Sequence, residues 1–112
     1  FLTIVEENGR RFYKAYLADR LDGPWTPLAD TAQRPFAGWA PIRPAKGVEP
    51  WVDNVSHGEL IRDGNDHTMT VAAGMLRFVF QGLLETDKAE AAKGYGQYPW
   101  RVGMLSSAEP PP

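Results

Sequence analysis

Short stretches of alternating apolar and polar residues, separated by turn signals, constrain the fold of this chain most. Residues 11–17 and 75–83 place every second side chain on one face, which is the pattern of a β-strand. Asn8-Gly9 is the pair preferred in tight hairpins, because both residues tolerate a positive φ. Apolar residues at the i, i+3, i+4 spacing of a helix do not persist beyond one or two turns. The sequence therefore predicts an all-β fold of antiparallel meanders.

The turn signals divide the chain into segments. The expected organisation is a meander over residues 1–29, a Pro-rich loop over 30–50, a second meander over 51–105 and a tail over 106–112. Strands are expected at residues 1–5, 11–17, 25–28, 57–62, 68–71, 75–83 and 102–105. Residues 86–93 could form a helical turn or two. The chain opens in the middle of an apolar strand, so we expect sequence to precede it.

The loop over residues 30–50 is far longer than the usual connection of about 4–6 residues, and such loops are either functional or disordered. Its prolines remove backbone donors and favour extended conformations. Large apolar residues are scarce in disordered linkers, yet this stretch and the residue after it carry four of them: Phe36, Trp39, Ile42 and Trp51. We therefore expect a packed loop.

Composition excludes several classes of protein. The 112 residues suit a single domain, and the net charge of −2 gives no reason to expect a nucleic-acid or membrane partner. No apolar run approaches the 18 or more residues of a membrane span. The chain has no cysteine, which excludes disulfides and thiolate metal sites but leaves the redox compartment open.

The stretch from residue 51 to 62, WVDNVSHGELIR, holds the most distinctive chemistry. Strand alternation puts two sets of side chains on opposite faces: His57, Glu59 and Ile61 on one, and Ser56, Gly58 and Leu60 on the other. Gly58 weakens a strand unless another group approaches the backbone closely there. His57 could ligate a metal or donate a hydrogen bond. The alternative is a partly buried His satisfied by a neighbouring carbonyl.

Other catalytic patterns are weak. Ser56 and His57 are neighbours on one strand and face opposite sides, which argues against a triad with Asp53. Two histidines cannot form a zinc site unaided, and His67 lies in a polar turn. Asp53 and Glu59 are the only acids near the key strand that could serve as a glycosidase pair. The Trp and Tyr residues around the long loop suit sugar stacking, although for any single ring a place in the hydrophobic core is the favoured alternative.

Several separate strings of residues resemble one known family. SHGELIR after Trp-x-Asp-Asn-Val, then DHTMT, LRFVFQG and YGQYPWRVGML, are similar to the C-terminal part of family 62 of the glycoside hydrolases. The opening, FLTIVEENGRRFYKAYLADRLDGPWTPLADT, resembles the segment just before it. The match runs in register over nearly the whole chain and covers roughly the last third of the family's catalytic domain.

The resemblance implies a fold and an activity. The family's members are secreted α-L-arabinofuranosidases that remove arabinose side groups from arabinoxylan with inversion, on a five-bladed β-propeller. This chain would then supply about two of the blades. His57 resembles the family's central His, which holds a cation, such as Ca²⁺, in the propeller channel. Tyr95 resembles a tyrosine that lines the sugar cleft. Gly96 departs from the Asn often found there and lacks the side chain for a xylan-backbone hydrogen bond.

The same resemblance places the catalytic residues outside this chain. The family's general base and second Asp lie on early blades, and its general acid lies on a strand just upstream of Phe1. Glu6 lies on the strand after that acid and is not assigned its role. Without the catalytic carboxylates, the chain alone is expected to be inactive. It would need the upstream blades or a complementary chain to complete the enzyme.

Two alternatives to an enzyme part stay open from the sequence: a non-catalytic carbohydrate-binding β module and an inactive fragment. A part of a propeller should expose apolar faces that normally pack on other blades. We expect those faces to carry two rows of side chains: Tyr13, Ala15 and Leu17 on one strand, and Leu76, Phe78 and Phe80 on another. A companion polypeptide in the same particle would separate the enzyme part from both alternatives.

Overall fold

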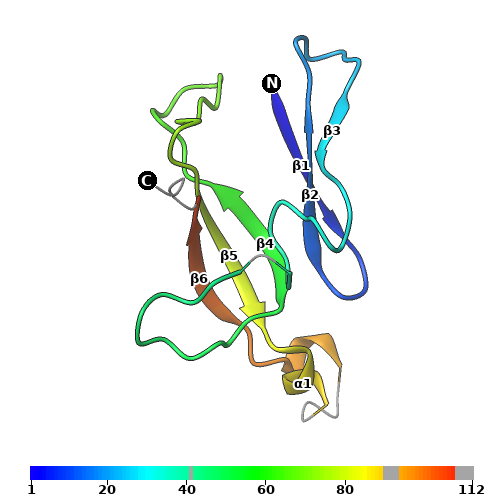
Figure 1. The fold of residues 1–112 in the computed structure, drawn as a ribbon, viewed down its shortest axis with the longest axis vertical. Coiled ribbons are helices and arrows are strands. Elements are labelled where there is room, and N and C mark those ends of the chain that lie inside the picture. The colour runs from blue at the N-terminus through cyan, green and yellow to red at the C-terminus, as the bar shows by residue number, and fades with distance from the viewer. Residues whose placement is uncertain (41, 90–93, 108–112) are drawn as a thin grey trace.

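The computed structural model describes residues 1–40, 42–89 and 94–107, and it is an all-β structure of two three-stranded sheets (Figure 1). The first sheet has the order β1-β2-β3, formed by Leu2–Glu7, Phe12–Leu17 and Thr26–Ala29. Glu7 pairs with Phe12 at the end of the first hairpin, where Gly9 takes a φ of 84°. The predicted hairpin and the predicted meander are therefore confirmed, but the connection spans residues 8–11 and only Gly9 of the Asn-Gly pair takes a positive φ.

The second sheet is also antiparallel and has the order β4-β5-β6. Its strands are Asn54–Leu60, Arg77–Leu83 and Arg101–Ser106. A short helix, α1 (Glu85–Lys88), and a 3-10 turn, η1 (Tyr95–Gln97), lie between β5 and β6. The helix begins one residue before the stretch 86–93 in which a helical turn was expected and overlaps its start. Residues 90–93 of that stretch lie outside the described residues.

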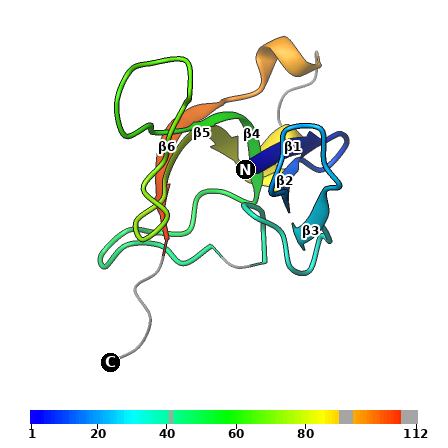
Figure 2. The same ribbon diagram turned by 90° about the horizontal axis from the view of Figure 1, so that it is seen from above.

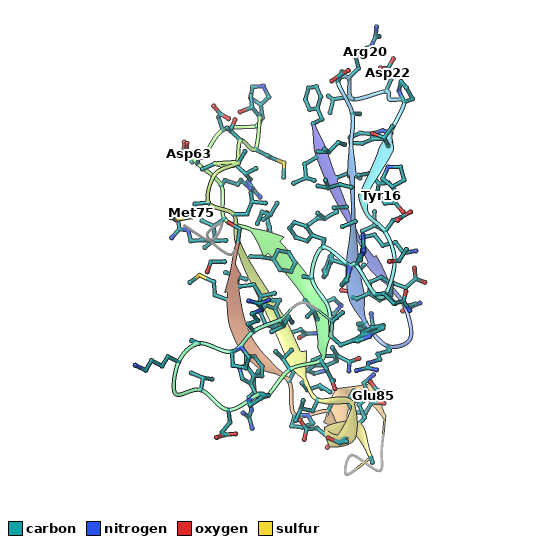
Figure 3. All side chains as sticks on the ribbon, in the orientation of Figure 1. Tyr16, Arg20, Asp22, Asp63, Met75 and Glu85 are labelled. Atoms are coloured by element: carbon teal, nitrogen blue, oxygen red, sulfur yellow. The ribbon has the colours of Figure 1, made fainter. Side chains whose placement is uncertain are left out.

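The prediction of a strand at residues 68–71 is wrong, because β4 pairs directly with β5. The segment between them is a loop, closed by a hydrogen bond from the Asp63 amide to the Thr70 carbonyl. The Asp66 carboxylate accepts from the Thr68 amide at 3.0 Å, and Met69 takes a φ of 54°, neither of which suits an extended strand. Asp63 and Met75 project from this connection, at the far end of the sheet from Glu85 on α1 (Figure 3).

The hydrophobic core lies between the two sheets. Its buried members are Tyr13, Ala37, Val55, Phe78 and Phe80. The Tyr13 and Phe78 rings meet edge to face, with their centroids 5.0 Å apart. The expectation that the rows of Tyr13 and Phe78 face other blades is therefore wrong in part, since Tyr13, Ala15, Phe78 and Phe80 are buried in this chain.

The long loop after β3 closes the core from a third side. The Phe36 amide donates to the Tyr13 carbonyl and the Tyr13 amide donates to the Ala37 carbonyl, both at 2.8 Å, so the loop forms an isolated bridge with β2. Phe36, Ile42 and Trp51 pack against the core, which confirms the prediction of a packed loop. The loop then runs out past β6 and returns to β4 (Figure 2). No helix in the described part of the chain is long and apolar enough to span a membrane.

Candidate functional site

A β-bulge in β4 is centred on His57 and Gly58. Ser56 pairs with Gln81 and Glu59 pairs with Val79, so β4 holds one residue more than β5 across this interval. His57 takes a φ of 44°, a left-handed conformation that is uncommon outside glycine. Such bulges redirect a side chain locally. Here His57 remains exposed while Ser56 before it is fully buried.

Gly58 is required by the ring of Phe78. A Cβ atom at position 58 would lie 2.2 Å from Phe78 Cζ, far inside any allowed contact. The prediction that some group approaches the backbone closely at Gly58 is confirmed, and the group is an aromatic ring of the core.

A carboxylate from the first sheet holds the bulge. Glu6 Oε1 accepts a hydrogen bond from the His57 amide at 2.6 Å and from the Tyr13 hydroxyl at 3.0 Å. Glu6 Oε2 accepts from Ser56 Oγ at 3.1 Å and pairs with the Arg11 guanidinium. The Tyr13 hydroxyl in turn accepts from the Gly58 amide at 2.8 Å. Both backbone donors of the bulge therefore point to the β1–β2 hairpin.

These contacts set the protonation of the cluster. Burial raises the pKa of Glu6, but hydrogen bonds from the His57 amide and from Arg11, Tyr13 and Ser56 outweigh it, so the pKa lies below the ordinary 4.5. Burial, with the neighbouring Glu6 charge, raises the pKa of the Tyr13 hydroxyl to about 12. Glu6 is therefore an anion near neutral pH, and Tyr13 keeps its proton for a hydrogen bond.

The His57 imidazole lies against Gln81 of β5, with Nδ1 2.9 Å from Gln81 Nε2. In this orientation the amide donates to Nδ1, and a neutral imidazole then carries its proton on Nε2. A half-turn of the amide would present its oxygen to an Nδ1–H group. The second tautomer leaves a lone pair on Nε2, which is the arrangement that metal-binding histidines use. The tautomer of His57 is therefore coupled to the orientation of the Gln81 amide.

The described residues do not form a metal site by themselves. Within residues 1–40, 42–89 and 94–107 there is no group of three or more His, Cys, Asp or Glu side chains placed to hold an ion. Ca²⁺ takes six to eight oxygen ligands. An imidazole supplies a nitrogen, so His57 could be at most one ligand of such a cation, beside oxygens from outside the described residues.

The acids near β4 are occupied by other contacts. Asp53 pairs with Arg10 at 3.3 Å and accepts from the Glu85 amide at 2.7 Å. Glu59 is exposed and pairs with Arg62, three residues along the chain. The structure gives neither acid a feature of a general acid or base.

The cleft residues expected near η1 lie between β5 and β6. Tyr95 begins η1, and its side chain lies outside what the structure describes. Gly96 follows it on an exposed turn, where a Cβ would meet no atom within 4 Å. An asparagine would therefore fit at this position without steric conflict.

Two Trp residues in and just after the long loop pack on other aromatic rings. Trp51 stacks on Phe80 with ring centroids 5.8 Å apart. Trp39 meets the edge of Phe12, and the Arg10 guanidinium lies 4.2 Å from its ring centre. A groove of about 560 Å³ lies between this part of the loop and β6.

The sequence did not reveal the role of Glu6 and Tyr13. Glu6 lies one residue beyond the strand expected at residues 1–5, but β1 extends through it and puts it on the same face as Leu2 and Ile4. An acid in line with apolar residues on a strand face is a signal for a polar partner. The backbone donor that Glu6 meets could not be predicted from the sequence, because His57 lies 51 residues away on the other sheet.

Comparison with known proteins places this chain in a family. Glycosyl hydrolase family 62 matches residues 1–106. The chain is 42% identical over 107 residues to alpha-L-arabinofuranosidase C of Cellvibrio japonicus, covering 94% of this chain and 16% of that protein. The chain belongs to glycosyl hydrolase family 62.

Solved structures of the family share the fold. The catalytic domain of an alpha-L-arabinofuranosidase from Coprinopsis cinerea matches with a TM-score of 0.80 and 34% identity, over 94% of this chain and 32% of that one. An arabinofuranosidase from Podospora anserina, in complex with cellotriose, matches with a TM-score of 0.82 and 33% identity, over 97% and 34%. A family 62 hydrolase in complex with xylotriose matches with a TM-score of 0.78 and 34% identity, over 95% and 32%. The chain thus spans about a third of these structures, and its two sheets are two blades of the family's propeller.

Proposed function

We propose that this chain is part of an inverting α-L-arabinofuranosidase that removes arabinose side groups from arabinoxylan. The observation that carries the proposal is the family match over residues 1–106, together with 42% identity to an arabinofuranosidase. The xylotriose complex of a related hydrolase supports a xylan-type substrate. Because such a polymer lies outside the cell, a secreted enzyme is part of the same proposal.

The chemistry of hydrolysis would come from carboxylates outside this chain. An inverting glycosidase needs a general acid with a raised pKa and a general base on the opposite side of the sugar ring. Glu6 is unsuited to the acid role, because its hydrogen bonds hold its pKa below the ordinary value. The chain would instead supply supporting groups: His57 on the second sheet, and Tyr95 and Gly96 along the sugar cleft.

His57 would act as one ligand of a cation or as a hydrogen-bond donor that shapes the cleft. A cation at this place would fix the geometry between blades, and its other ligands would come from outside the described residues. The orientation of the Gln81 amide decides between the two roles. When an Nδ1–H group faces the amide oxygen, Nε2 carries a lone pair and can ligate a cation. When Nδ1 accepts from the amide NH₂ group, Nε2 carries the proton and can donate a hydrogen bond.

A pair of histidine variants in the complete domain tests this proposal. We expect His57→Ala to lower kcat/KM for arabinoxylan by about 10- to 100-fold, the loss typical of groups that orient a site. His67→Ala is the matched control, because His67 is exposed in the β4–β5 loop and should leave activity within about twofold. Metal content, measured in parallel, separates ligation from donation.

Equal effects of the two substitutions on activity and metal content would contradict a special role for His57. The stereochemistry of the product tests the reaction type separately. Proton NMR of the first arabinose released should show the inverted anomer, and release of the retained anomer would overturn the inverting mechanism.

A further inference from the structure

We propose that Glu6 is a positioning residue that holds the His57 bulge, so that the first sheet sets the orientation of the His57 imidazole on the second. The inference rests on the proposed function of His57. It adds a group that lies on the other sheet and accepts a hydrogen bond from the His57 backbone amide.

The backbone conformation at His57 needs such a support. A residue other than glycine in a left-handed conformation is strained and persists only where its surroundings over-determine it. The surroundings here are the carboxylate of Glu6, which accepts from the His57 amide, and the hydroxyl of Tyr13, which accepts from the Gly58 amide. Without them two backbone donors would be left unsatisfied in a partly buried site.

The direction of these contacts explains why the side chain of His57 points outward. The His57 and Gly58 amides point toward the first sheet. Phe78 fills the space beside Gly58. The imidazole is exposed and meets Gln81 on the neighbouring strand. A change at Glu6 should therefore move the imidazole, because Glu6 holds the backbone amide of the same residue.

A carboxylate suits this position better than its amide. The two oxygens of Glu6 accept from the His57 amide, Tyr13, Ser56 and Arg11, and all of these groups donate. Glutamine would turn one of its acceptors into an NH₂ group facing a donor. Glu6→Gln should therefore disturb the bulge nearly as much as removal of the side chain.

A double-mutant cycle in the complete domain distinguishes positioning from general stability. We expect Glu6→Gln to lower kcat/KM by about tenfold or more. In the background of His57→Ala, Glu6→Gln should have little further effect on kcat/KM, because the imidazole that Glu6 positions is already absent. Glu7→Gln is the matched control: it removes one charge from the same strand, where Glu7 pairs with Lys14 at the surface.

A second readout does not depend on activity. The imidazole resonances of His57, followed by NMR against pH, should shift in Glu6→Gln and stay unchanged in Glu7→Gln. If Glu6→Gln fails to fold, Tyr13→Phe removes only the hydroxyl that binds the Gly58 amide and should shift the same resonances. Additive losses in the cycle, or His57 resonances that do not move in a folded variant, would overturn the inference. Loss of the proposed function itself would appear differently, as a His57→Ala variant with normal activity.

Discussion

At the scale of single residues, the site is built from a mismatch between two strands. The extra residue in β4 places His57 in a conformation that few residues adopt and turns its imidazole toward Gln81. Gly58 and Glu6 make this possible for different reasons. The first leaves room for the Phe78 ring, and the second satisfies the backbone donor of His57.

Replacement of Gly58 by alanine tests the steric part of this account. Because the new Cβ would lie 2.2 Å from Phe78 Cζ, we expect a loss of about 1–3 kcal/mol in the free energy of unfolding. Gly74→Ala is the control, since a Cβ there meets nothing within 4 Å. Urea denaturation of the complete domain measures both, and an unchanged midpoint for Gly58→Ala would contradict the packing described.

The low pKa of Glu6 predicts a pH dependence of stability. A carboxyl whose pKa is lower in the folded state stabilises the fold above its unfolded pKa, here 4.5, and that contribution is lost as pH falls through the folded value. We therefore expect the difference in unfolding free energy between wild type and Glu6→Gln to be largest at neutral pH and to shrink as pH drops below 4.5. A difference that is constant over this range would show that the Glu6 charge does not matter.

At the scale of elements, two sheets meet across aromatic rings and the long loop closes the third side. Phe78 is the central contact, 2% exposed, with Tyr13 at 5.0 Å and Phe36 at 5.6 Å between ring centroids. We expect Phe78→Ala to cost about 3–5 kcal/mol in the free energy of unfolding. Leu28→Ala on the edge strand β3 serves as the control, because Leu28 is 57% exposed and should change stability by less than about 0.5 kcal/mol. Similar losses for both would contradict the assignment of the core.

The sequence could predict elements whose signals are local. The Asn8-Gly9 turn follows from the conformational preferences of those residues, and β5 follows from its alternating aromatic residues. Residues 68–71 were predicted wrongly as a strand, because β-branched residues suggested extension while Asp66 binds Thr68 locally. The His57 bulge could not be predicted, since it depends on Glu6, which is distant in the sequence.

At the scale of the whole molecule, the chain leaves one apolar face and several strand edges uncovered. The face of the second sheet away from the core carries Val79, Val102 and Met104, which are 37%, 80% and 59% exposed. The strands β1, β3 and β6 each have one unpaired edge within their own sheets. The outer edge of β4 is covered instead, because its Val55 amide donates to the Arg11 carbonyl of the β1–β2 hairpin at 2.9 Å. Unpaired edges invite pairing with other chains.

This geometry predicts the behaviour of the chain in isolation. A large apolar side chain contributes about 1.5–3 kcal/mol when buried, which is a sizeable part of a total stability of about 5–15 kcal/mol. We expect the 112 residues to fold stably only with a complementary chain or with copies of themselves. Size-exclusion chromatography with light scattering at micromolar concentration measures this. A soluble monomer that unfolds cooperatively would favour an independent carbohydrate-binding module.

The most direct test of the central claim is arabinose release from arabinoxylan by the purified 112-residue chain and by the complete domain that contains it. We propose that the catalytic carboxylates lie outside the chain, and Glu6 is engaged in hydrogen bonds that support the His57 backbone. We therefore expect the complete domain to release arabinose and the chain alone to release none above background. Turnover by the chain alone, free of any other polypeptide, would contradict the account and point to Glu6, Asp53 or Glu59 as catalytic groups.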